Sequence, residues 1–350
     1  MKISDSIISP VEKPYIIAEV SANHGGKLSQ AMDLVAAAAD AGASAVKFQT
    51  YTADTMTIEC DRPEFRIENA ESLWNGRTLY DLYDEAHTPW DWHEPLFEEA
   101  KRLGIHAFSS GFDETAIDFL ETLDPPCYKV ASFEHTFIPL LEKVAQTKKP
   151  VIVSCGLASM DEIQKSVQTL TNAQSGPLCL LACTSSYPAS VADSNLRRIP
   201  ALKEAFPGCQ IGLSDHTIGS TAAIAAVALG ACVFEKHFKL SGDDTSVDAA
   251  FSVTPEGLRD YVDAINDAWA ALGEAKFGAA SDSEAQSLQF RRSIYVVADI
   301  GEGEAFTRDN IKCIRPGLGL ETEHFSSVLG KTAAKTIERG TPLSLALVAG

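Results

Sequence analysis

Short apolar segments rich in β-branched residues alternate with longer amphipathic segments along most of this chain. The short segments predict β-strands buried on both faces, because such strands are hydrophobic at nearly every position. We expect eight of them, at residues 15–20, 45–49, 105–109, 127–131, 150–154, 178–183, 210–213 and 232–235. The amphipathic segments predict helices at residues 30–41, 91–103, 114–123, 138–146, 160–170, 195–205, 220–229 and 256–272.

Eight strand–helix repeats favour an α/β fold of the (β/α)8 TIM-barrel type. A doubly wound open sheet is the alternative, although such sheets usually have fewer strands. One connection, residues 50–89, is too long for an ordinary loop. We expect a lid or a substrate-binding segment there, and the alternative is an excursion that packs on the flank of the barrel.

The remainder of the chain predicts a second, smaller domain. Polarity rises towards residues 276–289, which we interpret as a linker between a first domain at 1–275 and a second at 290–350. The second domain has short strands and turns. Because about 60 residues is small for an independent core, we expect this domain to pack against the barrel or against a partner subunit.

Charge and cysteine content exclude several classes of function. The net charge of −19 argues against nucleic-acid binding, and the absence of a basic run argues against a polybasic membrane contact. No apolar stretch is long enough to span a membrane. The eight cysteines are scattered without a CxxC pair, and the first residues lack the apolar core of a signal peptide, so we expect a cytoplasmic protein.

Polar residues gather where the predicted strands end, which is where a TIM barrel carries its chemistry. Lys47 and Lys129 lie within strands, and a buried lysine is rare unless it is paired. A structural ion pair with Glu19 or Glu134 would explain them. A phosphate pocket would also explain them, with the lysines as point charges and strand-end serines as hydrogen-bond donors.

Two histidines follow neighbouring strands, His216 in SDHT and His237 in EKHF. A strand, a short helix and a parallel strand place both strand ends at one edge of a sheet. Imidazole is a common ligand of catalytic divalent metals, so the pair predicts an open metal site beside Glu19, which could move a proton. The alternative is two unrelated histidines, one of them a satisfied core residue.

Several motifs together resemble those of the sialic acid synthase family. They are AEVSANHGG, AVKFQTYTADTMT, YKVASFE, VIVSCGLAS, GLSDHT and EKHF, in the family's order. The tail RRSIYVVADIGEGEAFTRDNIKCIRPGLGL resembles the family's C-terminal SAF, or antifreeze-like, domain, which has a β-clip fold. The resemblance covers essentially the whole chain.

The resemblance implies a C–C bond-forming transferase. Phosphoenolpyruvate would condense with an open-chain sugar whose aldehyde oxygen binds a divalent metal, Mn²⁺ or Mg²⁺. Water would then add at C2, and phosphate would leave by C–O cleavage. The stretches QTYTADTMT, TLYDLYDEAHTPWDWH, CTSSYPA and VDAAFSVTP are most similar to members that use 2,4-diacetamido-2,4,6-trideoxy-L-altrose.

The resemblance also implies roles for individual residues. The catalytic group would contain Glu19 with the metal ligands His216 and His237. Phosphoenolpyruvate would contact Lys47, Ser110, Lys129, Ser132, Ser154 and Ser214. The sugar would contact Gln49, Glu134, Ser185, Tyr187, Asp248 and, from the SAF domain of the other subunit in a domain-swapped homodimer, Arg315.

Some stretches depart from the family pattern, and they leave the sugar open. Phe137 stands where an acidic residue is expected, and Lys239 with Asp243–Asp244 is unusual after the last strand. We expect these residues near the sugar. A legionaminic or N-acetylneuraminic acid synthase is the alternative, although Ser185 replaces the asparagine typical of the latter. A non-catalytic sugar-binding protein and a metal-dependent hydrolase are more distant alternatives.

Overall fold

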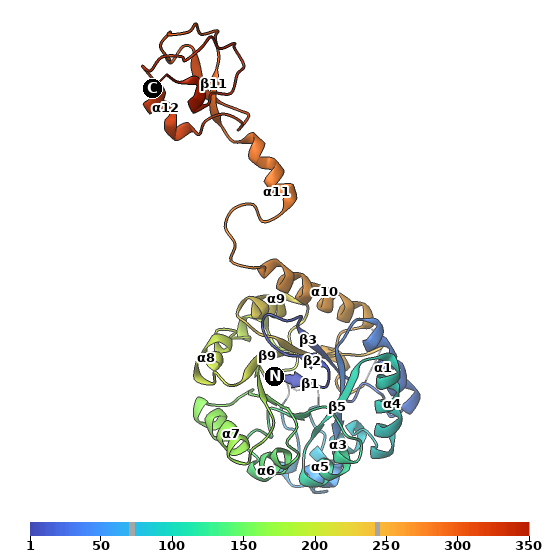
Figure 1. The fold of residues 1–350 in the computed structure, drawn as a ribbon. Coiled ribbons are helices and arrows are strands. Elements are labelled where there is room, and N and C mark those ends of the chain that lie inside the picture. The colour runs from blue at the N-terminus through green and yellow to red at the C-terminus, as the bar shows by residue number, and fades with distance from the viewer. Residues whose placement is uncertain (70–73, 242–245, 350) are drawn as a thin grey trace. The chain divides into compact units, whose positions relative to one another are not determined.

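The fold is that of a computed structural model, which describes residues 1–69, 74–241 and 246–349 (Figure 1). The chain divides into two compact units, Met1–Gly273 and Glu274–Gly350. Each unit has its own hydrophobic core. The larger unit carries every strand of the predicted repeat.

Eight parallel strands close into a barrel in the order β10-β3-β4-β5-β6-β7-β8-β9. The TIM barrel is therefore confirmed, and the open sheet is wrong. The strands match the predicted apolar segments, with β9 and β10 each extending two residues further than expected. Their bounds are β3 (Tyr15–Glu19), β4 (Ala45–Thr50), β5 (His106–Gly111), β6 (Tyr128–Val130), β7 (Val151–Ser154), β8 (Leu178–Cys183), β9 (Gln210–Asp215) and β10 (Val233–His237).

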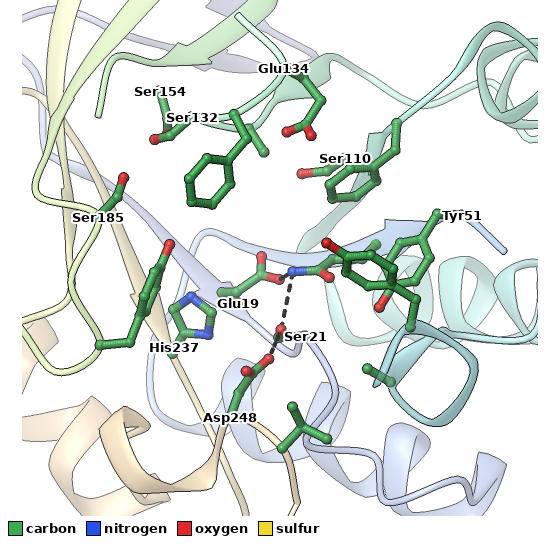
Figure 2. A pocket seen from close by; sticks show the side chains of 18 of the residues that line it. Glu19, Ser21, Tyr51, Ser110, Ser132, Glu134, Ser154, Ser185, His237 and Asp248 are labelled. Carbon is green, nitrogen blue, oxygen red and sulfur yellow. Dashed lines mark hydrogen bonds between the residues drawn. The ribbon is translucent and has the colours of Figure 1, made fainter. Parts of the chain in front are cut away.

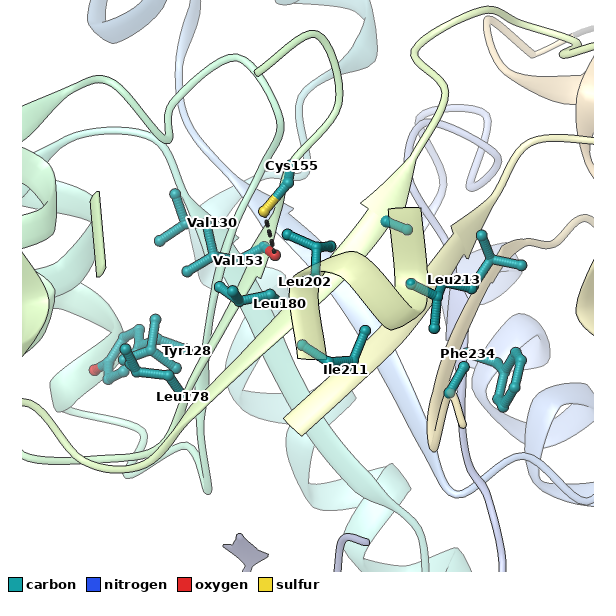
Figure 3. Close-up of a cluster of buried hydrophobic side chains, with 14 of the residues drawn as sticks. Tyr128, Val130, Val153, Cys155, Leu178, Leu180, Leu202, Ile211, Leu213 and Phe234 are labelled. Carbon is teal, nitrogen blue, oxygen red and sulfur yellow. Dashed lines mark hydrogen bonds between the residues drawn. The ribbon is translucent and has the colours of Figure 1, made fainter. Parts of the chain in front are cut away.

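Helices surround the barrel, as Figure 1 shows. Side chains such as Val130, Leu180 and Phe234 point outward from the strands into a buried layer between strands and helices (Figure 3). The helices of this ring are α1 (Leu28–Asp40), α4 (His93–Leu103), α5 (Glu114–Glu121), α6 (Ile138–Gln146), α7 (Met160–Asn172), α8 (Arg198–Ala205), α9 (Thr221–Ala228) and α10 (Pro255–Leu272).

The interior of the barrel is apolar at one end. Alternate residues of a strand point to the same side, so Ile17, Phe108 and Val233 all face inward and pack in one cluster. A hairpin of β1 (Lys2–Ile3) and β2 (Ser6–Ile7) closes this end, because Ile3 and Ile8 join the same cluster. The sequence pattern did not predict this hairpin.

The long connection after β4 is partly helical. It contains α2 (Ala53–Met56), the 3₁₀ turns η1 (Pro63–Phe65) and η2 (Trp90–Trp92), and α3 (Leu79–Ala86). The Thr78 hydroxyl caps α3 by accepting a hydrogen bond from Asp81 N at 3.1 Å. The Tyr80 hydroxyl donates to Asp54 Oδ1 at 3.2 Å and so joins α3 to α2.

Two further 3₁₀ turns, η3 (Val191–Asp193) and η4 (Ala249–Phe251), lie in the connections that follow β8 and β10. Among the described residues, no helix is both long enough and apolar enough to cross a membrane.

The smaller unit begins with α11 (Asp282–Gln286) and η5 (Ser287–Phe290) in the segment that we predicted to be a linker. Strands β11 (Ser293–Val296) and β12 (Ile311–Ile314) pair antiparallel. The unit ends with η6 (Thr322–His324), α12 (Phe325–Val328) and η7 (Leu345–Leu347). Ile294, Phe306 and Ile337 belong to its core, so this unit buries apolar side chains of its own.

Candidate active site

A pocket of about 490 Å³ opens at the C-terminal ends of the barrel strands. Its size is typical of small-molecule sites. Arg315 is the predicted site residue that does not line it, being exposed in the smaller unit. The structure brings the other fourteen together: Glu19, Lys47, Gln49, Ser110, Lys129, Ser132, Glu134, Ser154, Ser185, Tyr187, Ser214, His216, His237 and Asp248.

The floor of the pocket is a network of buried charges. Glu19 and Lys47 form an ion pair, and Glu235 Oε2 lies 3.7 Å from Lys47 Nζ and 3.8 Å from Lys129 Nζ. Burial disfavours the charged form of Glu235, but Lys129 and Lys47 outweigh it and lower its pKa. The pair of Lys47 with Glu19 confirms one of the ion pairs that we considered. In the described part of the chain, Glu134 pairs with neither lysine.

Serine hydroxyls and a backbone amide gather beside this floor. Ser110 Oγ accepts a hydrogen bond from Lys47 Nζ at 3.1 Å, and Ser132 Oγ accepts one from Gly156 N at 3.2 Å. Within the described residues the buried Ser154 Oγ has no partner. Figure 2 shows Ser132, Ser154 and Ser185 on one side of the pocket. Such groups next to two lysines can receive an anion of phosphate size.

Gly156 lets the backbone approach this serine group closely. A Cβ at position 156 would lie 2.7 Å from Ser132 Oγ and would collide with Ser185 Oγ. Any larger residue would therefore push aside two hydroxyls that line the pocket.

The two histidine rings lie side by side, with centroids 5.3 Å apart. His216 Nδ1 donates to the carbonyl oxygen of Thr184 at 2.9 Å, which leaves Nε2 as the free nitrogen. His237 Nδ1 is buried without a partner in the described residues. Burial, followed by the nearby His216, keeps the pKa of His237 well below its usual value, so this ring is neutral.

These imidazoles fit a divalent metal, because each has a ring nitrogen without a hydrogen-bond partner among the described residues, His216 Nε2 and His237 Nδ1. The described residues contain no group of three or more histidine, cysteine, aspartate or glutamate side chains arranged to hold an ion. The protein would thus supply two ligands, and the remaining positions would be open to water or substrate.

A chain of hydrogen bonds joins the carboxylates of Glu19 and Asp248 in the pocket (Figure 2). Gln49 Nε2 donates to Glu19 Oε1 and to Ser21 Oγ, both at 3.1 Å, and Ser21 Oγ donates to Asp248. Burial raises the pKa of Glu19 to about 7, and burial likewise raises that of Glu134 to about 7. Each carboxyl can therefore exchange a proton near neutral pH.

Comparison with known proteins assigns the family. Residues 34–277 match the model of the NeuB family, and residues 291–349 match that of the SAF domain. The chain belongs to the NeuB family. This confirms the resemblance read from the sequence.

Individual members of the family align over nearly the whole chain. A pseudaminic acid synthase of Campylobacter jejuni is 43% identical over 335 residues, covering 95% of this chain and 96% of that protein. An N,N'-diacetyllegionaminic acid synthase of Legionella pneumophila is 35% identical, covering 94% and 93%. The spore coat polysaccharide biosynthesis protein SpsE of Bacillus subtilis superposes with a TM-score of 0.68 at 31% identity, covering 100% and 99%.

Among the lining residues that were missing from the predicted site, three stand out. Glu235 bridges the two lysines, Ser21 links Gln49 to Asp248, and Tyr51 lines the wall. Glu235 and Ser21 lie at the predicted strand ends, as many other polar residues do. Their position alone therefore did not mark them as members of the site. Tyr51 directly follows β4, and an aromatic residue at a strand end is usually part of a core, so the sequence did not single it out.

Of the described residues that depart from the family pattern, neither Phe137 nor Lys239 lines the pocket. Phe137 precedes α6 and is 41% exposed, whereas Phe133 and Glu134 of the same stretch do line the pocket. Lys239 Nζ donates to the carbonyl oxygen of Ala249 at 2.7 Å, and so supports the turn that follows Asp248. Asp243–Asp244 lie outside the described residues.

Proposed function

We propose that this protein condenses phosphoenolpyruvate with 2,4-diacetamido-2,4,6-trideoxy-L-altrose to give pseudaminic acid and phosphate. The observation that carries the proposal is that two lysines, several serine hydroxyls and two histidines line one pocket of a NeuB-family barrel. The 43% identity to the Campylobacter pseudaminic acid synthase favours this sugar over that of the Legionella enzyme, at 35%.

Lys47 and Lys129 would bind the phosphate and carboxylate of phosphoenolpyruvate, because both lie at the floor of the pocket among hydroxyl donors. Glu235 already holds both ammonium groups in place, so the lysines need little rearrangement to stabilise charge in the transition state. Ser132 and Ser154 would donate hydrogen bonds to the same anion.

His216 and His237 would hold Mn²⁺ or Mg²⁺, for which their free ring nitrogens provide support. A metal bound there would polarise the sugar aldehyde as a Lewis acid. The test is metal binding itself. We expect His237→Ala to lose Mn²⁺ binding in calorimetry and to lose turnover, whereas His324→Ala in the smaller unit should match the wild type. Unchanged Mn²⁺ binding by His237→Ala would remove this assignment.

Glu19 would take the proton from the water that adds to C2 after C3 of phosphoenolpyruvate has attacked the aldehyde. Its pKa of about 7 suits a general base at neutral pH, and Gln49 holds its orientation. Loss of phosphate with the bridging oxygen then leaves the new ketone. The overall balance is sugar, phosphoenolpyruvate and water giving product and phosphate.

The experiment that tests the proposal is phosphate release with phosphoenolpyruvate and Mn²⁺ for three sugars. These are the L-altro diacetamido sugar, its D-manno counterpart and N-acetylmannosamine. We expect turnover with the first. Preference for the D-manno sugar would favour a legionaminic acid synthase, and preference for N-acetylmannosamine would favour a sialic acid synthase. No turnover with any sugar would contradict an enzyme of this family.

We further propose a domain-swapped homodimer in the reducing cytosol. Exposed apolar side chains around the pocket mouth support a covering partner: Phe133 is 61%, Leu157 is 73% and Ile218 is 71% exposed. Leu318, three residues after Arg315, is 71% exposed as well. All eight cysteines are free thiols, as is usual for proteins of the reducing cytosol, and this supports the proposed location. A monomeric mass in light scattering, with full activity, would contradict the dimer.

A further inference from the structure

Helix α3 presents an apolar face to the pocket. Leu79, Leu82, Tyr83 and Ala86 all line it, and their spacing of three and four residues places them on one side of a helix. Between them, Asp81, Asp84 and Glu85 are exposed. The helix is thus amphipathic, and its buried side faces a cavity as well as a core.

This wall contrasts with the polar floor. Leu79, Leu82 and Ala86 carry no polar side-chain atom, and Tyr83 packs edge-on against Tyr51 with ring centroids 5.9 Å apart. Tyr51 packs in the same way on Phe112 at 5.1 Å. A ligand group that contacts α3 gains by burying apolar surface, whereas a hydroxyl placed there would lose its hydrogen bonds to water.

The topology of the barrel sets α3 on the side of the pocket opposite His216. The helix belongs to the connection between β4 and β5, and β5 lies four strands from β9 in either direction around the closed sheet. His216 directly follows β9. A six-carbon chain whose C1 is at the histidines therefore points its far end towards the side of the pocket from which α3 extends.

We infer that the α3 wall, defined as Leu79, Leu82 and Ala86, receives the C6 methyl of the sugar and selects against a hydroxyl at C6. This inference rests on the proposed function and names the element that gives it specificity. A 6-deoxy sugar places a methyl group where a 6-hydroxy sugar places a polar one. The wall therefore discriminates by the cost of an unpartnered hydroxyl.

The test compares two sugars that differ by one oxygen, namely 2,4-diacetamido-2,4,6-trideoxy-L-altrose and 2,4-diacetamido-2,4-dideoxy-L-altrose. We expect the wild type to prefer the 6-deoxy sugar by about 10- to 100-fold in kcat/KM, the range for a small group in an apolar pocket. Leu82→Asn and the more accessible Leu79→Asn should each lower this ratio about tenfold. Leu82→Met should keep it.

Asp84→Asn provides the matched control, because it places the same side chain on the exposed face of the same helix. We expect it to leave the ratio unchanged. A third sugar, 2-acetamido-2,6-dideoxy-L-altrose, has a hydroxyl in place of the acetamido group at C4. If the leucine variants change the preference at C4 and leave that at C6 intact, the wall binds the acetamido methyl and the inference is wrong.

The outcomes separate this inference from the proposed function. Equal use of the 6-deoxy and 6-hydroxy sugars by the wild type would overturn the role of the wall while the condensation itself stands. A wild-type enzyme that uses none of the three sugars would overturn the proposed function and the inference with it. If Leu82→Asn does not fold, Leu79→Asn and the wild-type ratio still decide.

Discussion

The two ends of the barrel interior are built from the same strands and carry opposite chemistry. At the closed end, Ile17 and Val233 pack against the N-terminal hairpin. Two residues further along the same strands, Glu19 and Glu235 stand beside the lysines of the pocket. A step of two residues keeps a side chain on the same face, so the change is in residue type and not in orientation.

This difference separates what holds the fold from what binds the substrate. The apolar end stabilises the barrel by burying hydrocarbon. The charged end stabilises the fold less, because ions taken out of water lose favourable hydration energy. Only well-aligned ion pairs and hydrogen bonds offset that loss. We therefore expect substitutions at the two ends to affect different measurements.

The largest contrast is between Lys129→Met and Ile17→Ala. Lys129→Met should lower kcat/KM by about 10²- to 10³-fold, the usual effect of losing one group that stabilises transition-state charge. It should leave the free energy of unfolding nearly unchanged or higher, because burial lowers the pKa of this lysine and Glu235 keeps Lys47 as a partner.

Ile17→Ala should do the opposite. It removes a fully buried side chain and should lower the free energy of unfolding by about 2–5 kcal/mol, while kcat of the folded enzyme stays near the wild-type value. Denaturant unfolding and steady-state kinetics of both variants provide the measurements. If Lys129→Met unfolds as readily as Ile17→Ala, the division between the two ends is wrong.

The dependence of kcat/KM on pH tests the role of Glu19 at the charged end. Because the pKa of Glu19 is raised to about 7 and a base must be ionised, kcat/KM should rise with pH and level off above 7. A single ionisation with this pKa predicts a loss of about fiftyfold between pH 7 and pH 5. If Glu19 is the base, the Glu134→Gln variant should show the same rise of kcat/KM with pH. A flat profile down to pH 5 would exclude Glu19 from that role.

A smaller effect is expected at Gly156, where the backbone shapes the serine side of the pocket. Gly156→Ala should raise KM for phosphoenolpyruvate about tenfold, equivalent to about 1.4 kcal/mol, because the new Cβ displaces Ser132 and Ser185. Gly208→Ala is the control, since a Cβ there meets nothing within 4 Å. Equal KM values for both variants would show that Ser132 does not bind this substrate.

The smallest effect concerns Arg315 of the smaller unit. Arg315→Ala should raise KM for the sugar about fivefold, the value of one ordinary hydrogen bond to an acetamido oxygen, with KM for phosphoenolpyruvate unchanged. Kinetics with each substrate varied in turn make this measurement. An unchanged KM for the sugar would remove the proposed role of the SAF domain.

The sequence predicted the barrel and the charged and hydroxyl-bearing part of the pocket, for physical reasons that also explain what it missed. Strands buried on both faces are apolar along their length, so polar residues stand out within them, as Lys47 and Lys129 do, and at their ends, as His237 does. The link from Ser21 to Asp248 joins residues 227 positions apart, and no local periodicity reveals it. The N-terminal hairpin was missed because each of its strands has two residues.

The amphipathic spacing of α3 could have been found in the sequence, but a stripe at this spacing is usually core. Only the fold reveals that this stripe faces a cavity. Function at the apolar wall is therefore harder to predict than function at the charged floor, where buried ions already require an explanation.

The most direct test of the account follows the bridging oxygen of phosphoenolpyruvate. The enzyme would be incubated with the L-altro diacetamido sugar, Mn²⁺ and phosphoenolpyruvate labelled with ¹⁸O at the C2–O–P position, and both products analysed by mass spectrometry. We predict a nine-carbon product without label and phosphate that carries it. Label in the nine-carbon product, or no such product at all, would contradict the reaction proposed for this pocket.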